Sequence, residues 1–211
     1  MSTGDENLRM IYPEFPIETY IHHRNRYLFA DNMLPDTIQI FDFGCGTGYG
    51  TDILRRGNRF VIGFDKNHDD VEYAKEKYKS MWYFCKNIVN MNYTYTDAVV
   101  MFECLEHLTK KDALKVLDKI NHFVNYVVLS TPKAAKLGIN RNHKSQWTVD
   151  KLKDALYGFD VVSIFGQDWS SGQILYPFSV QTSMYIVYAY KKKEQIGFGA
   201  ESCEKKLIEK S

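Results

Sequence analysis

The chain has 211 residues, 45% hydrophobic and 25% charged, with a formal net charge of +1. These values are typical of one soluble globular domain, alone or with a tail, and the charge balance gives no support to a general affinity for polyanions such as nucleic acid. Since no apolar run approaches membrane-spanning length and the N-terminus has no signal pattern, we expect a cytoplasmic protein without a membrane span.

Apolar runs typical of buried strands alternate with segments of helical periodicity along the chain. In order, we expect a helix over 18–34, strand 38–43, helix 51–56, strand 60–64, helix 68–79, strands 81–85 and 98–102, a helix from 109, strand 126–129, helix 148–156, and strands 159–165 and 182–190. Strands that alternate with helices require right-handed crossovers and form a mostly parallel sheet. We therefore predict a doubly wound α/β domain over residues 18–190, after an N-terminal arm (1–17) and before a charged C-terminal tail (191–211).

A glycine-rich turn follows the first expected strand, with Gly44, Gly46 and Gly48 at alternate positions. Glycine accepts positive φ and lets a ligand touch the backbone. The second expected strand ends on Asp65, so a carboxylate meets this turn at the carboxyl edge of the sheet. A glycine-rich turn after the first strand and an acid after the second are typical of the nucleoside-binding half of such folds.

Two nucleoside cofactors fit this pattern, and the details favour S-adenosylmethionine. A dinucleotide needs Gly-x-Gly-x-x-Gly, whereas Tyr49 stands at the third glycine position here. Asp42, just upstream, is unfavourable beside a pyrophosphate but suits the amino group of S-adenosylmethionine. Asp65 can accept hydrogen bonds from both ribose hydroxyls.

Four segments carry a resemblance to a known family. Phe41–Gly50 resembles the first motif of class I S-adenosylmethionine-dependent methyltransferases. Phe102–Leu108 resembles the Glu-x-x-Glu-His motif of the branch that contains ubiquinone-pathway and cell-surface sugar methyltransferases. Leu129–Lys133 and Arg26–Ala30 are similar to the fifth-strand motif and the first helix of that branch.

This resemblance implies a Rossmann-like sheet of seven strands whose last strand is antiparallel, with helices on both faces. It implies that Asp42 and the glycine turn hold the methionine part, that Asp65 holds the ribose, and that Asn87 and Ile88 flank the adenine. The full cofactor-binding set is then Tyr20, Arg26, Asp42, Gly44, Cys45, Gly46, Gly48, Asp65, Lys66, Asn87, Ile88 and Glu103.

The role of a second group of residues stays open between three alternatives. Glu103, Glu106 and His107 share one face if a helix begins there, and His143 lies in a later loop. In the first, Glu103 and Glu106 cap backbone amides at a helix start and His143 holds its loop. In the second, His107, His143 and Glu103 are the catalytic residues, with one of the histidines as the base or a substrate contact. Alternatively, Glu103, Glu106, His107 and His143 bind a divalent metal, which resembles the small-RNA 3′-terminal 2′-O-methyltransferases.

We therefore predict a methyltransferase that acts on a hydroxyl or amine of a small molecule or glycan precursor and that uses no metal. One alternative is a metal-assisted 2′-O-methyltransferase of RNA 3′ ends, which the near-neutral charge does not support. The other is a partner subunit that binds S-adenosylmethionine without catalysis.

Overall fold

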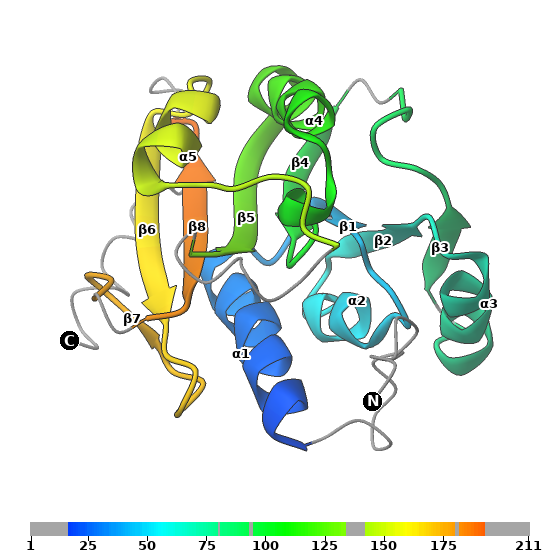
Figure 1. The fold of residues 1–211 in the computed structure, drawn as a ribbon. Helices are drawn as coiled ribbons and strands as arrows, with labels where there is room; N and C mark the ends of the chain where they lie inside the picture. Colours follow the sequence, from blue (N-terminus) through cyan, green and yellow to red (C-terminus); the bar gives the residue numbers. More distant parts are fainter. Residues whose placement is uncertain (1–16, 80, 93–94, 134–141, 180–181, 193–211) are drawn as a thin grey trace.

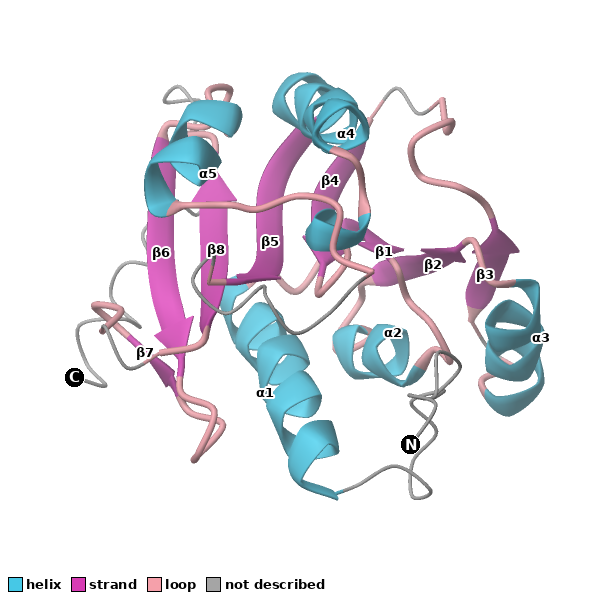
Figure 2. Cartoon of the chain, in the orientation of Figure 1, coloured by secondary structure: helices cyan, strands magenta, loops and turns pink. Residues whose placement is uncertain are grey.

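The computed structural model describes residues 17–79, 81–92, 95–133, 142–179 and 182–192, so most of the predicted N-terminal arm and C-terminal tail lie outside the described residues. In the described part, helices cover both faces of one central sheet (Figures 1 and 2). The elements are α1 (Ile17–Met33), β1 (Gln39–Phe43), α2 (Tyr49–Leu54), β2 (Phe60–Asp65), α3 (His68–Lys77), β3 (Trp82–Cys85), β4 (Thr96–Met101), η1 (Leu105–His107), α4 (Lys110–Phe123), β5 (Val124–Pro132), α5 (Val149–Ala155), β6 (Val161–Gln167), β7 (Ile174–Leu175) and β8 (Met184–Tyr190).

The strand order is β3-β2-β1-β4-β5-β8-β6-β7, and β8 lies antiparallel between β5 and β6. The doubly wound, mostly parallel sheet with an antiparallel last strand is therefore confirmed. The expected count of seven strands is wrong by one, because the two-residue β7 pairs with the end of β6. Two residues are too few to carry a periodicity that a sequence pattern can reveal.

Two cores lie on opposite faces of the sheet, with α1, α2 and α3 on one side and α4 and α5 on the other (Figure 1). Because side chains alternate along a strand, Phe41 and Phe43 of β1 pack into the core that contains Leu117 of α4. Ile40 points to the other face and belongs to the core that contains Tyr27 of α1. None of the described helices has both the length and the apolar character needed to cross a lipid bilayer.

Local chemistry explains where several elements begin and end. Thr109 caps α4: its hydroxyl accepts the backbone N–H of Asp112 at 3.2 Å and donates to the Asp112 carboxylate at 2.7 Å. β5 was expected to end before Pro132, but it extends through this residue, which stands opposite Met184 of β8. A proline at the last position of a strand costs the ladder only one donor, so the antiparallel partner extends the strand.

Candidate functional site

The turn after β1 carries the predicted glycines and is tied to the end of β2. The backbone N–H of Gly44 donates to the carbonyl of Phe64 at 2.8 Å, and that of Gly46 donates to Oδ2 of Asp65 at 2.9 Å. Gly46 has φ +50°, and a Cβ added there would meet no atom within 4 Å. The backbone at Gly46 therefore borders open space at the carboxyl edge of the sheet, where a ligand can approach it.

Gly48 closes the other side of the same turn by packing. It has φ +85°, and an added Cβ would lie 2.8 Å from Cβ of Ala74 in α3 and from the hydroxyl oxygen of Tyr83 in β3. The Tyr83 hydroxyl donates to the carbonyl of Gly48 at 3.1 Å. Cys45 lies beneath the turn, only 2% exposed, so any contribution it makes to ligand binding comes through its backbone.

Asp42 lies behind the turn and is fully buried. Its Oδ2 accepts the Thr51 hydroxyl of α2 at 2.7 Å, and the Tyr27 hydroxyl of α1 lies 3.3 Å from its Oδ1. Burial raises the pKa of Asp42 to about 7, against the lowering effect of these two hydroxyls. Through these two hydroxyls Asp42 joins β1 to α1 and α2.

Asp65 is partly exposed at the end of β2. Its Oδ2 accepts the Gly46 N–H, and its Oδ1 accepts the backbone N–H of Asn67 at 2.8 Å. A carboxylate has about four acceptor positions, so each oxygen can still accept a hydroxyl. The backbone N–H of Lys86 donates to the carbonyl of Asp65 at 2.7 Å and brings the end of β3 alongside.

The remaining residues predicted to flank the cofactor differ in exposure. Lys66 and Asn87 are exposed, and Ile88 is buried in the core under α4. The Asn87 side-chain oxygen accepts the backbone N–H of Val89 at 3.0 Å, which shapes the turn after β3. Tyr20 of α1 packs against the glycine turn at its α2 end, since its ring centroid lies 5.6 Å from that of Tyr49.

A partly buried ionic cluster joins α1 to the end of β4. Glu103 follows β4 with φ +46°, and its Oε1 forms an ion pair with Nη1 of Arg26 and lies 3.3 Å from Nε2 of His23. Desolvation is the largest effect on the pKa of Glu103 and raises it, but the charge and hydrogen bond of Arg26, together with the nearby histidines, outweigh desolvation and hold this pKa at about 2. Burial lowers the pKa of His23 to about 4, so His23 is neutral at pH 7.

Arg26 is completely buried, yet one of its nitrogen atoms is left without a partner among the described residues. Its Nε–H donates to Oε1 of Gln167 at 2.7 Å, and its Nη1 serves Glu103. Its Nη2 has no hydrogen-bond partner within the part of the chain that the structure describes. A buried guanidinium nitrogen without a partner is costly, so this atom is suited to an anionic group of a ligand.

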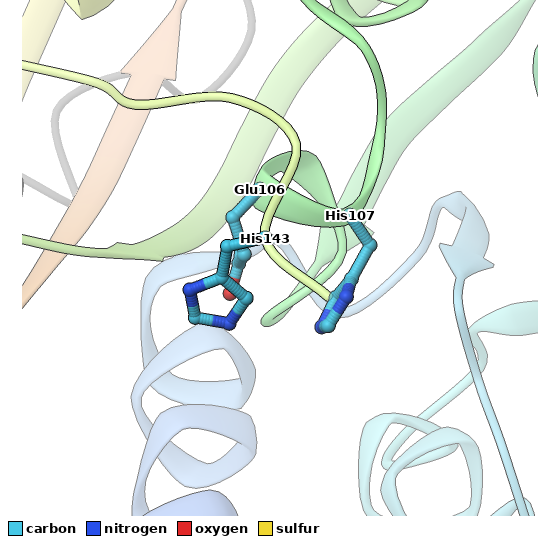
Figure 3. A group of neighbouring side chains, drawn as sticks. All are labelled: Glu106, His107 and His143. Carbon is cyan, nitrogen blue, oxygen red and sulfur yellow. The ribbon is translucent and has the colours of Figure 1, made fainter. Parts of the chain in front are cut away.

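Glu106, His107 and His143 form a second cluster (Figure 3). Each offers an oxygen or nitrogen atom, and these atoms all lie within 4.8 Å of one another. The imidazole centroids of His107 and His143 are 5.0 Å apart, with the rings at 81°. The figure shows the three side chains next to one another, two from η1 and one from the segment that carries His143.

Hydrogen bonds to η1 explain why a distant loop delivers His143 to this position. The backbone N–H groups of Lys144 and Ser145 donate to the carbonyl of Glu106 at 2.7 and 3.1 Å. The Ser145 hydroxyl donates to the carbonyl of Leu105 at 3.1 Å and accepts Nε1–H of the fully buried Trp147 at 3.0 Å. Residues 142–147 are thus fixed on η1 through both backbone and side chains.

The charge state of this cluster follows from its burial. Glu106 is 1% exposed, and neither carboxyl oxygen has a hydrogen-bond partner of normal geometry among the described residues. Burial, reinforced by the negative charge of Glu103, raises the pKa of Glu106 to about 8. Burial also lowers the pKa of both His107 and His143, and each imidazole lies in range of the charge of Glu103. At pH 7 the cluster is a protonated carboxyl group beside two neutral imidazoles.

One expectation about these residues is corrected. Glu103, Glu106 and His107 do not share a helix face, because the helix there is the single 3-10 turn η1, which begins after Glu103. Glu103 pairs with Arg26 and His23 instead. Of the four residues in the metal alternative, the structure brings three into one group.

Two residues of the site were missed from the sequence. His23 stands three positions before Arg26, so both reach the same carboxylate from one side of α1. Gln167 ends β6 and touches Arg26 across 141 positions of the chain. The spacing in α1 was a usable signal for His23, whereas no local pattern marks Gln167.

Comparisons with known proteins agree with this geometry. Residues 40–125 match the family model described as a methyltransferase domain. A putative methyltransferase of Invertebrate iridescent virus 6 is 35% identical over 99 residues, which are 42% of this chain and 36% of the viral protein. A probable S-adenosylmethionine-dependent methyltransferase of Mycobacterium tuberculosis is 24% identical over 176 residues, which are 78% of this chain and 63% of that protein.

A similar fold occurs in solved structures. The crystal structure of a SAM-dependent methyltransferase from Archaeoglobus fulgidus has a TM-score of 0.64 at 18% identity, over 82% of this chain and 94% of the other. This likeness concerns the fold alone. The matched region spans less than two thirds of the length of both relatives above, 36% and 63%.

Proposed function

We propose that this chain, which carries an S-adenosylmethionine-dependent methyltransferase domain, methylates a hydroxyl group of a small molecule or a glycan precursor. The observation that carries the choice of a hydroxyl is the pair of neutral imidazoles, His107 and His143, at the carboxyl edge of the sheet. A hydroxyl becomes a strong nucleophile only as it loses its proton, and a neutral imidazole accepts that proton.

The donor side of the site, which comprises the glycine turn, Asp65 and Arg26, fits S-adenosylmethionine in charge and in space. We assign the ribose hydroxyls to the free acceptor positions of Asp65, and the carboxylate of the methionine part to Nη2 of Arg26. Gly46 borders open space, so the cofactor can contact the protein backbone there. Asn87 and Ile88 are assigned to the adenine edge, and Asp42 holds the turn in place through Thr51 and Tyr27.

The remaining predicted contacts keep supporting roles in this proposal. Tyr20 closes the methionine side against Tyr49, and the backbone at Gly44, Cys45 and Gly48 shapes the turn. Lys66 is exposed next to Asp65. Glu103 holds Arg26 and His23 in place rather than acting as a base, since a carboxyl group with a pKa of about 2 is a weak proton acceptor.

When bound, the cofactor supplies an activated methyl group on sulfur with a good leaving group. The residues of this chain then align the acceptor, exclude water and accept one proton. His107 or His143 takes the hydroxyl proton. The imidazole alone accepts this proton, because Glu106 is already protonated. The positive charge that appears on the imidazole lowers the pKa of Glu106, so the carboxyl group can release its own proton to solvent and the resulting carboxylate stabilises the imidazolium.

A screen for methyl transfer tests this proposal. Phenols, sugars and matched amines are incubated with S-adenosylmethionine, and S-adenosylhomocysteine release and product mass are measured. We expect transfer to hydroxyls that His143→Gln reduces and that falls as pH drops through the imidazole pKa. His122→Gln changes an exposed histidine at the end of α4 and is the matched control. Transfer to amines alone would refute the choice of acceptor, and binding without any transfer would favour the partner-subunit alternative.

A second candidate is metal-assisted methylation of an RNA ribose, which the grouping of Glu106, His107 and His143 favours. A carboxylate and two imidazoles suit Mn²⁺ and related ions, and a bound cation would hold Glu106 ionised. Titration of the protein and of His143→Ala with Mn²⁺, followed by calorimetry, separates the candidates. If the unaltered protein binds Mn²⁺ with micromolar affinity, the variant does not, and the protein methylates an RNA 3′ end, this second candidate is correct and the first proposal is wrong.

A further inference from the structure

The side-chain amide of Gln167 is buried and all of its hydrogen-bonding groups but one lone pair are used. It is 1% exposed at the end of β6. Its Oε1 accepts Nε–H of Arg26 at 2.7 Å, and its Nε2 donates to the carbonyls of His22 at 3.0 Å and Gly172 at 3.1 Å. Arg26 is a donor only and a carbonyl is an acceptor only, so the orientation of the amide is fixed by its partners.

The segment that follows Gln167 lies against α1. The carbonyl of Gly172 also accepts Nδ2–H of Asn25 at 3.1 Å. The Trp169 indole stacks on the His22 imidazole, with centroids 4.7 Å apart and planes at 4°. Asp168 closes the turn, since its N–H donates to Gln173 and its carbonyl accepts Gly172 N–H, both at 2.9 Å.

Two functional parts therefore meet at this one amide. On one side is Arg26, whose Nη1 holds Glu103 and whose Nη2 has no partner in the described part of the chain. On the other side is the turn 168–173, which carries the half-exposed Trp169. The contacts join α1 to a segment more than 140 positions away, so chain connectivity does not set their relative position.

We infer that Gln167 is a positioning residue: it orients the Arg26 guanidinium and fixes the turn 168–173 on α1, so that the donor side and the Trp169 turn assemble as one unit. This inference rests on the proposed function in one respect, namely that Arg26 binds the carboxylate of the cofactor. Gln167 itself touches neither reactant. Loss of its amide should loosen the turn and weaken cofactor binding together.

A buried amide elsewhere in the chain provides a matched control. Asn121, 4% exposed on α4, donates to the carbonyl of Ala155 at 2.9 Å and accepts the N–H of Gly158 at 3.1 Å. It lies at the end of α4, next to the start of β5, and so at the opposite edge of the sheet from the glycine turn. A purely structural amide is expected to behave like Asn121.

The experiment measures S-adenosylhomocysteine binding by calorimetry and amide hydrogen exchange over residues 168–173 in the full chain. In Gln167→Leu we expect about tenfold weaker binding or more, the effect of losing a hydrogen bond to a charged group, and faster exchange over the turn. Asn121→Leu should lower the melting temperature and change neither readout. In an Arg26→Lys background, which removes the Nε–H bond to Gln167, Gln167→Leu should weaken binding little further.

The outcomes separate this inference from the proposed function. If the unaltered protein does not bind S-adenosylhomocysteine, the cofactor assignment fails. If it binds and Gln167→Leu binds equally well, or if the losses in the double variant are additive, the positioning role is overturned. Should Gln167→Leu not fold, Gln167→Glu serves instead: a carboxylate cannot donate to His22 and Gly172, and its charge competes for Arg26, so the same two changes are expected.

Discussion

The buried carboxyl group of Glu106 makes a prediction that does not depend on knowing the acceptor. Its pKa is about 8 in the folded protein and about 4.5 when the chain is unfolded. Because the folded pKa is raised, the contribution of Glu106 to stability is fully present below about pH 4.5 and is lost as pH rises toward about 8. Glu106→Gln cannot ionise and escapes this loss.

The magnitude follows from proton linkage. Between pH 5 and 7 the unfolded chain has released the Glu106 proton and the folded protein has kept it, which costs about 1.4 kcal/mol per pH unit. Relative to the unaltered protein, Glu106→Gln should therefore gain roughly 2–3 kcal/mol in free energy of unfolding over these two units. Any fixed cost of burying the amide is the same at both pH values and cancels.

Urea denaturation at pH 5 and pH 7 in the presence of a chelator measures this difference. Glu72→Gln is the control, because Glu72 is exposed on α3 beside Lys75 and its pKa is lowered rather than raised. It should show none of the gain. Parallel stability curves for Glu106→Gln and the unaltered protein would refute the claim that a neutral carboxyl group lies next to His107 and His143.

Three further predictions concern the turn and the helices. Gly48→Ala should destabilise the protein more than Gly46→Ala in thermal melts, since both residues have positive φ but only at Gly48 does the new Cβ overlap Ala74 and Tyr83; equal costs would contradict this packing. Arg26→Lys should weaken S-adenosylhomocysteine binding in calorimetry at least tenfold, because lysine cannot serve Glu103, Gln167 and a ligand carboxylate together; unchanged affinity would remove Arg26 from the donor site. Thr109→Ala should lower the free energy of unfolding by about 1 kcal/mol through loss of the α4 cap, and a neutral change would mean that the cap does not contribute.

The glycine turn and its contact with Asp65 were predictable because the residues that form them are close in sequence. Glycines at alternate positions after one strand and an acid at the end of the next specify a backbone geometry, and the structure shows Gly46 bonded to Asp65. Periodicity likewise predicted the alternation of strands and helices and hence a mostly parallel sheet, whereas the antiparallel last strand was implied by the family resemblance. The family model described as a methyltransferase domain matches residues 40–125, which include this turn and Asp65.

The rest of the site depends on contacts that no local pattern encodes. Glu103 was expected to share a helix face with Glu106 and His107, because the three residues stand at positions i, i+3 and i+4. Instead, Glu103 has a positive φ and its side chain pairs with Arg26. Gln167 and His22 meet across 145 positions. Such contacts are set by how α1 packs beside β6 and β7, and the two-residue β7 was itself below what periodicity can detect.

The central claim is that the carboxyl edge of β1 and β2 binds S-adenosylmethionine through Asp65, and calorimetry with the cofactor tests it most directly. Asp97→Ala is the matched control, because Asp97 also accepts a backbone N–H, from Gln39 at 2.8 Å, but lies near the opposite ends of the strands. The account predicts binding by the unaltered protein and by Asp97→Ala, and its loss in Asp65→Ala. Unchanged affinity in Asp65→Ala would contradict the assignment.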